Sequence, residues 1–546
     1  MHGLTRSLVA LAGATAAFAA SIPKGAPTVH LDKATFYGLH NGSADMFLGI
    51  PYAQPPVGNL RYRQPVAVEP YTGIHNATEF GFSCPGIEDP PPSGPFETVL
   101  DDLLDDKFPG LQNSTQPQNE DCLTANIWVP KGAKKGDKYP VVLWLHLGAF
   151  VYGGSSSYNG GFVVERSVEN GQPIIYVSIN YRLAAFGFLP GKEAQAAGIT
   201  NLGMRDQRQA LRWIQTYIES FGGDPTRVTI WGVNAGSESA ACQMLTNNGD
   251  TEGLFSGAVM QSGFPLPLNN YTQLQSTYDG LVNATNCTTA SNTLDCLREL
   301  PFETLYNGMI NLPLEQRTSG WQLILDFDFI PDQPPTLLME GKVAKVPYIM
   351  GDTDDEGTET ALFFTSTITT DDELFSYVQN ELVPGISDNE TSQILELYPA
   401  DPAAGSPFDT GDANAITPEF KRLSAIIGDL EFHGQRRFFL NQTAHLMPSY
   451  TWLSKLYKDI PYVGSGTVTD DLNLYGPGAL TDYLINFVAL GTPNNGTGLE
   501  WPTWTKSSPN ILTIVNNTET PLLITDDTFR SEGINLLIEL NLQHPE

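Results

Sequence analysis

Residues 228–237 read Val-Thr-Ile-Trp-Gly-Val-Asn-Ala-Gly-Ser, and they predict a sharp turn between a strand and a helix. The strand is the apolar run 228–231, the turn lies between Gly232 and Gly236, and the helix covers 238–245. This is the layout of a nucleophile elbow, which presents a serine for attack on an ester carbonyl. The central residue here is Asn234, and a carboxamide is a very poor nucleophile. The sequence therefore predicts a site built for ester chemistry that lacks the attacking atom.

The elements that must position this turn alternate along the chain. Short runs rich in β-branched residues predict buried strands at 141–146, 174–179, 228–231 and 348–350, and helical patterns such as 206–221 lie between them. Such alternation predicts an α/β fold with a large, mostly parallel central sheet and helices on both faces. No linker is evident, so we expect one domain over 21–546.

The net charge and an N-terminal segment limit the partners and the location that the chain can have. Lys and Arg number 29 against 61 Asp and Glu, which gives a net charge of −32 and disfavours nucleic acid and anionic membranes as partners. Residues 1–20 resemble a secretory signal, with Arg6 before a short apolar run. No later stretch of about 18 apolar residues predicts a membrane anchor.

The chain also carries marks of export. Ten Asn-x-Ser/Thr sites occur, at Asn41, Asn76, Asn113, Asn270, Asn283, Asn286, Asn389, Asn441, Asn495 and Asn516. Beside a signal segment, so many sites predict a secreted or secretory-pathway glycoprotein.

Five cysteines give two candidate bridges. We pair Cys287 with Cys296, which lie close together, and Cys84 with Cys122, which flank a Pro- and Asp-rich stretch. Cys242 is then left as a small buried hydrophobe. The stretch 85–121 is either a flap over a site or a solvated loop. No Cys and His spacing predicts a metal site, and no cofactor is expected.

Longer motifs carry a resemblance to a family. They are Phe47 to Gly58, Leu60-Arg61-Tyr62, Glu120 to Leu123, Asn126 to Pro130, Asn180 to Leu183, Phe221 to Pro225, Trp501-Pro502 and Asp526 to Arg530. Together they resemble the type-B carboxylesterase and lipase family, which also contains the cholinesterases. The resemblance covers nearly the whole mature chain and implies an α/β-hydrolase fold. It also implies both bridges, because the family pairs its cysteines in the same way.

The family's machinery is a Ser–Glu–His triad with a three-amide oxyanion hole. The resemblance places the acid at Glu356 and the oxyanion amides at Gly148, Ala149 and Ala235. Leu147 departs from the family's glycine at its position, so the backbone angles of this loop are in question. The nucleophile position holds Asn234, and asparagine tolerates the positive φ of such a turn.

The base is replaced as well. The family's histidine position falls on Thr467, or on Thr469 if the alignment shifts, and a hydroxyl is too reluctant to accept a proton near neutral pH. His433 is the nearest upstream histidine and is interpreted as structural. Ser237 and Ser239 follow the elbow in the first helical turn, where capping or packing is the favoured role.

Three functions remain open. The first is binding of a small apolar ester or carbonyl ligand, with a non-hydrolytic step such as cyclisation, elimination, rearrangement or dimerisation at the amides. The second is ester hydrolysis, as in a carboxylesterase or lipase, with a nucleophile outside the aligned position. The third is a non-catalytic binding or adhesion role. Loss of a triad serine or histidine costs about 10⁶ in rate, which places the first ahead of the second.

Overall fold

Strong strand formers build one large sheet at the centre of the chain. The computed structural model describes residues 22–87, 116–265, 267–467, 469–474, 478–516 and 520–544. Neighbouring strands follow the order β14 (Leu522–Asp526), β13 (Asn510–Val515), β12 (Ser449–Lys455), β11 (Tyr348–Thr353), β10 (Gly257–Gln261), β9 (Gly223–Val233), β7 (Tyr139–Leu145), β8 (Ile175–Ile179), β6 (Thr124–Pro130), β4 (Ala44–Pro51) and β3 (Leu39–Asn41). The pairs from β8 to β13 are parallel, and those at both edges are antiparallel.

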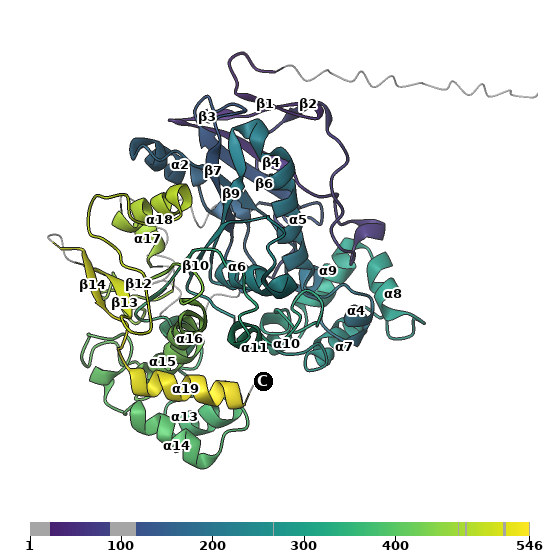
Figure 1. Ribbon diagram of the computed structural model, residues 1–546. Coiled ribbons are helices and arrows are strands. Elements are labelled where there is room, and N and C mark those ends of the chain that lie inside the picture. Colours follow the sequence, from purple (N-terminus) through teal and green to yellow (C-terminus); the bar gives the residue numbers. More distant parts are fainter. Residues whose placement is uncertain are drawn as a thin grey trace, which may run out of the picture.

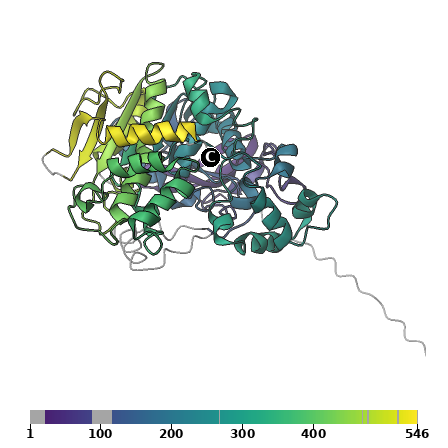
Figure 2. The same cartoon turned by 90° about the horizontal axis from the view of Figure 1, so that it is seen from below.

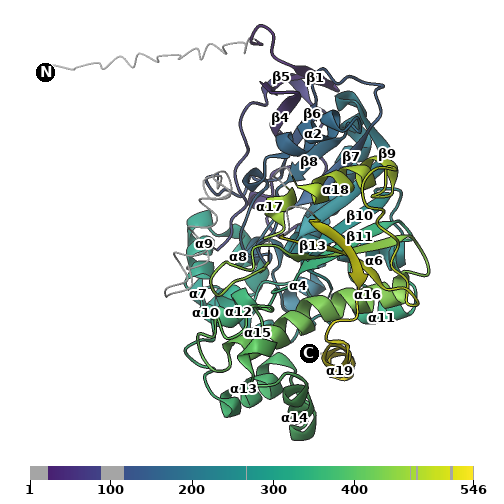
Figure 3. The same cartoon turned by 90° about the vertical axis from the view of Figure 1, so that its left-hand side faces the viewer.

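Helices cover both faces of this sheet (Figures 1 and 3). The α-helices are α2 (Gly160–Glu169), α3 (Ala184–Gly187), α4 (Lys192–Ala196), α5 (Leu202–Tyr217), α6 (Ala235–Leu245), α7 (Gln275–Ala284), α8 (Thr293–Glu299), α9 (Phe302–Ile310), α10 (Leu314–Thr318), α11 (Pro334–Met339), α12 (Thr358–Leu362), α13 (Asp371–Tyr377), α14 (Asp388–Leu397), α15 (Phe420–Gly428), α16 (Gly434–Thr443), α17 (Asp471–Leu474), α18 (Ala479–Leu490) and α19 (Ser531–Gln543). A small sheet of β1 (Thr28–Leu31), β2 (Lys33–Tyr37) and β5 (Thr72–Asn76) precedes them.

Strand β7 shows why the sequence folds as layers. Val141, Leu143 and Leu145 belong to an apolar core shared with α5 and α6, whereas Val142 and Trp144 belong to one shared with α2 and α18. Successive side chains of a strand point to opposite sides, so a continuous apolar run needs cover on both. A third apolar core joins α12–α15 to α19, which lies across the green helices in Figure 2.

The predicted elements agree with the fold, with shifted ends. The strand predicted at 141–146 is β7, the strand predicted at 228–231 is the apolar part of β9, and the fold class is confirmed. The helix predicted at 206–221 is α5, which starts earlier, at Leu202, directly after Asn201, whose backbone is left-handed. The helix predicted at 238–245 starts at Ala235, directly after the turn.

Two disulfides tie peripheral segments to the fold. Cys84 is bonded to Cys122, and Cys287 is bonded to Cys296, so both predicted bridges are confirmed. The single-domain prediction for 21–546 and the signal prediction for 1–20 stay predictions, and residues 1–21 lie outside the described residues. The predicted flap also falls largely outside them, at 88–115.

Candidate functional site

Backbone contacts hold the predicted elbow in place. Between β9 and α6, Asn234 adopts φ 52° and ψ −120°, a sharp turn that bulky residues rarely adopt. A side chain at either flanking glycine would strike main chain, because a Cβ on Gly232 would lie 2.1 Å from Gly236 O and one on Gly236 would lie 2.0 Å from Leu145 O. The backbone N–H of Asn234 also donates to Gln261 O at 2.9 Å. The turn is therefore formed although its serine is absent.

The Asn234 side chain contacts two of the amides predicted to form an oxyanion hole. Its Oδ1 accepts a hydrogen bond from Ala149 N at 3.2 Å and a longer one from Gly148 N at 3.5 Å. Ala235 begins α6, where an amide has no partner within the helix. We expected the amides to be open to a ligand; instead the two loop amides already hold an oxygen of the chain itself.

The oxyanion loop keeps a strained backbone. Gly148 has φ 119°, Ala149 φ 48° and Phe150 φ 64°, all in the left-handed region. Leu147 is not among the positive-φ residues, so the departure from glycine falls where a side chain is tolerated. Leu147 therefore does not need the conformational freedom of glycine, because the left-handed stretch of backbone begins one residue later.

Glu356 is the centre of a buried hydrogen-bond network after β11. It is 1% exposed and accepts from Ser262 Oγ at 2.7 Å, from Thr353 N at 2.6 Å and from Thr467 Oγ1 at 2.7 Å. Burial, and after it the neighbouring Asp352 carboxylate, raises the pKa of Glu356 well above its usual range. Three donors thus converge on the two oxygens of this buried carboxyl.

Thr467, the predicted base position, contacts the predicted acid Glu356. Its hydroxyl bonds to Glu356, whereas the hydroxyl of Thr469 donates to Gly466 O at 2.7 Å. Of the two aligned alternatives, Thr467 is therefore the one that contacts Glu356.

The upstream histidine lies in a different network. His433 is 1% exposed, and its Nδ1 lies 2.9 Å from Asp352 Oδ2. Asp352 also accepts from Arg436 Nε at 2.7 Å, and Arg436 pairs with Asp527. This contact set is that of a structural histidine inside a buried ion network.

The two serines after the elbow are enclosed. Ser237 and Ser239 are both fully buried. Ser237 Oγ donates to Gly263 O at 2.5 Å, and Ser239 Oγ accepts from Gln207 Nε2 at 2.9 Å. Neither hydroxyl therefore projects from the turn in the way that the central residue of the elbow does.

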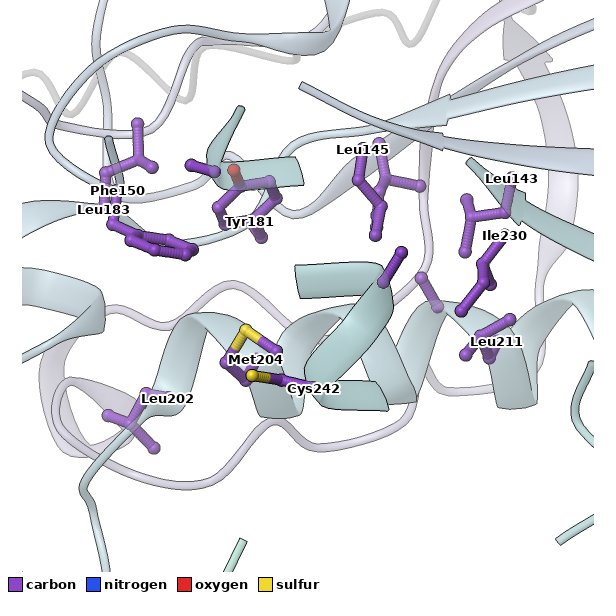
Figure 4. Close-up of a cluster of buried hydrophobic side chains, with 14 of the residues drawn as sticks. Leu143, Leu145, Phe150, Tyr181, Leu183, Leu202, Met204, Leu211, Ile230 and Cys242 are labelled. Carbon is purple, nitrogen blue, oxygen red and sulfur yellow. The ribbon is translucent and has the colours of Figure 1, made fainter. Parts of the chain in front are cut away.

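Cys242 packs in the core behind the elbow. It is a buried free thiol, and Figure 4 shows it beside Met204 and below Tyr181. Burial raises the pKa of this thiol, which makes it inert as a nucleophile.

Shortly after Thr467 in the chain, two adjacent carboxyls share one hydrogen-bond donor. Gln261 Nε2 donates to Asp470 Oδ1 at 2.8 Å and to Asp471 Oδ1 at 2.6 Å. Trp452 Nε1 donates to Asp470 at 3.0 Å, and Tyr158 OH donates to Asp471 at 2.8 Å. Burial raises the pKa of Asp470 to about 6 and that of Asp471 to about 7, so the pair shares protons near neutrality.

Sequence reasoning missed three residues at this site. They are Ser262, which bonds to Glu356 from a left-handed φ of 51°; Asp471; and Glu238, in the first turn of α6. A polar residue directly after the strand 257–261 was a usable signal for the first. The other two depend on partners and burial that the sequence does not display.

Among the residues that the structure describes, no helix is both long and apolar enough to cross a bilayer. Over the same ranges, no group of three or more His, Cys, Asp or Glu side chains could hold a metal ion.

Known proteins resemble this chain over most of its length. The model of the carboxylesterase family matches residues 26–417. Lipase 4 of Diutina rugosa is 37% identical over 94% of this chain and 96% of its own length. Secreted lipase 1 of Botryotinia fuckeliana is 37% identical over 88% of each. The crystal structure of Aspergillus niger EstA matches with a TM-score of 0.78 and 25% identity, covering 95% of this chain and 99% of that one. With its α/β-hydrolase sheet, its formed elbow and these relatives, the chain belongs to the carboxylesterase family.

Proposed function

We propose that this protein binds a small apolar ester or related carbonyl compound at the elbow and does not process it through an acyl-enzyme. One observation carries the proposal: Asn234 stands in the nucleophile position with its Oδ1 on the amides of Gly148 and Ala149. A side-chain carboxamide neither attacks a carbonyl nor becomes a good nucleophile beside a base.

The acid and base side supports the same conclusion. The hydroxyl of Thr467 bonds to Glu356 in the predicted base position, and a hydroxyl is a very weak proton acceptor near neutral pH. Loss of a triad serine or histidine alone costs about 10⁶ in rate, because the residues act as a unit.

Ester hydrolysis is the second candidate, and the relatives favour it. Several are named lipases, and two are named as secreted. These relatives favour hydrolysis over the cyclisation, elimination, rearrangement or dimerisation that the residues alone suggested. No observation on the described residues favours an adhesion role.

Two measurements separate the candidates. The first follows hydrolysis of 4-nitrophenyl butyrate, and the second is intact mass after exposure to diethyl 4-nitrophenyl phosphate. The proposal expects turnover at the level of the buffer and an unchanged mass. A diethylphosphoryl adduct on any hydroxyl would overturn it and establish hydrolysis.

We also propose that the chain is exported. Relatives named as secreted lipases and the two disulfides support this, since such bridges persist in oxidising compartments. N-glycosylation at the predicted sites is part of the proposal. A fall in mass on treatment of the exported chain with peptide N-glycosidase is the expected result, and an unchanged mass would remove it.

A further inference from the structure

Two carboxyls that are adjacent in the chain lie buried without a cation. Asp470 is fully buried, and Asp471 is 1% exposed. Among the residues that the structure describes, neither carboxyl forms an ion pair with a Lys, Arg or His side chain. A buried charge is costly unless an opposite charge accompanies it, and two carboxylates at one site disfavour each other's ionisation. The pair therefore holds a proton more readily than exposed carboxyls do.

The donors around the pair show which carboxyl can hold that proton. Asp470 accepts from Gln261 Nε2 at 2.8 Å and from Trp452 Nε1 at 3.0 Å, and both of these nitrogens can only donate. Asp471 accepts from Gln261 Nε2 at 2.6 Å and from Tyr158 OH at 2.8 Å. A hydroxyl accepts as well as donates, so Tyr158 can receive a hydrogen bond from a protonated Asp471. The hydrogen-bond geometry thus places the proton on Asp471.

The same contacts attach a helix to the end of a central strand. Asp471 begins α17, and Gln261 ends β10. The backbone O of Gln261 accepts from the backbone N–H of Asn234, and the next residue, Ser262, donates to Glu356. The carboxyl pair therefore holds the side chain of a residue on which both halves of the candidate site rest.

We propose that Asp470 and Asp471 form a pH-sensitive latch between α17 and the end of β10. The latch is closed while Asp471 holds a proton. It is released when both carboxyls are ionised, because two like charges then share the Gln261 amide at a buried site. This device goes beyond the proposed function, since it does not depend on what the elbow binds.

The charged groups on the surrounding elements are paired with other partners. Asp352, at the end of β11, accepts from Arg436 and lies beside His433. On α18, which packs against α17, Asp482 accepts from Arg166. The remaining titratable groups of β12 and α18 are Lys455, which pairs with Asp354 and Asp409, Tyr450, which bonds to Thr492, and Tyr483, which donates to Leu499 O.

The latch loosens as the pH rises. Burial raises the pKa of Asp471 to about 7 in the closed latch, whereas the released carboxyl returns to its ordinary value of 3.8. Opening therefore releases a proton between these two pH values, and each proton released makes opening about tenfold more frequent per pH unit. We expect opening to increase from about pH 5 to about pH 7 and to level off above about pH 7.5.

Hydrogen exchange followed by mass spectrometry tests the latch on the full chain. Protection of peptides that cover 469–474 is measured from pH 5 to pH 8.5, and each rate is divided by the intrinsic rate of the unfolded chain at that pH. The unaltered chain should lose about tenfold or more in protection per pH unit up to about pH 7. Peptides that cover β8 report on the rest of the fold and should keep their protection.

Two variants separate the latch from other titrations. Asp471→Asn imitates the protonated carboxyl, because its amide can donate to Tyr158 while its oxygen accepts from Gln261. This variant should keep 469–474 protected at every pH. Asp482→Asn is the matched control, since it removes a carboxyl of the adjoining helix that is paired with Arg166. It should leave the pH dependence in place, and thermal melts establish that each variant is folded.

Three results would overturn the proposal. The first is protection of 469–474 that does not change with pH in the unaltered chain. The second is the same loss of protection in Asp471→Asn, since a different group would then be titrating. The third is an equal loss in the peptides of β8, which would show opening of the whole fold and not of one helix.

Discussion

The two halves of this site are built in different ways. On the nucleophile side, the turn at Asn234 is set by the main-chain contacts of Gly232 and Gly236, so its shape is independent of the central side chain. On the acid and base side, the structure is set by side-chain hydrogen bonds to Glu356, and Thr467 takes part in that network. Geometry enforced by backbone survives a substitution unchanged, whereas geometry built from side chains is rebuilt around the new residue.

Restoring both halves together gives the largest expected effect. Asn234→Ser with Thr467→His frees the two loop amides and supplies an attacking oxygen and a base in contact with Glu356. We expect 4-nitrophenyl butyrate hydrolysis to rise at least about 10³-fold, because the triad acts as a unit. Asn234→Ser alone is the control and should gain far less. A folded, inactive double variant would show that the pocket itself has changed.

Breaking the backbone of the nucleophile side should cost stability. Gly236→Ala places a Cβ 2.0 Å from Leu145 O, and main chain cannot move aside cheaply. We expect a loss of about 3 kcal/mol in the free energy of unfolding, measured by urea denaturation. Gly171→Ala, at φ 69° in open space, should lose about 1 kcal/mol from strain alone. Equal losses in both would contradict the claim that close contacts set the turn.

On the acid and base side, the titration of Asp471 should make stability depend on pH. The pKa of Asp471 is raised to about 7, so its stabilising contribution is complete below pH 3.8 and is lost as pH rises through about 7. Asp471→Asn removes this loss and should raise the free energy of unfolding at pH 8 by on the order of 2 kcal/mol, with little change near pH 4.

A carboxyl that is paired with an arginine should give stability the opposite dependence on pH. Arg166 donates to Asp482, and the pKa of Asp482 is lowered. Asp482→Asn should therefore reduce stability at pH 8 and have less effect in acid. If Asp471→Asn behaved in the same way, the Asp470 and Asp471 carboxyls would have to be charged in the folded chain.

The smallest effect should come from a single hydrogen bond. Thr467→Val removes the donor to Glu356 Oε2, while Ser262 and Thr353 still bond to the other oxygen. We expect a loss of about 1 kcal/mol, read from the thermal midpoint, and almost full recovery in Thr467→Ser. An equal loss in Thr467→Ser would show that packing, and not the hydroxyl, matters there.

Sequence reasoning predicted the parts of this molecule that follow from local spacing. The strand before the elbow, its two glycines and both disulfides could be predicted, because each depends on neighbouring residues or long motifs. The contact of Asn234 Oδ1 with the amides of Gly148 and Ala149 was not predicted, since it depends on the rotamer of one side chain. The pairing of Asp471 with Gln261 joins residues 210 positions apart, and the burial of Glu238 depends on the packed core. Such features arise from tertiary contacts that periodicity does not record.

The bridge between Cys84 and Cys122 closes a covalent ring of the intervening chain, with the two cysteines 38 positions apart. A protease that cuts once inside this ring leaves both fragments joined through sulfur. A nicked preparation therefore migrates as one band on a non-reducing gel and separates into two when a thiol is added. Oxidised samples conceal such cleavage, so integrity of this protein is judged on reduced material.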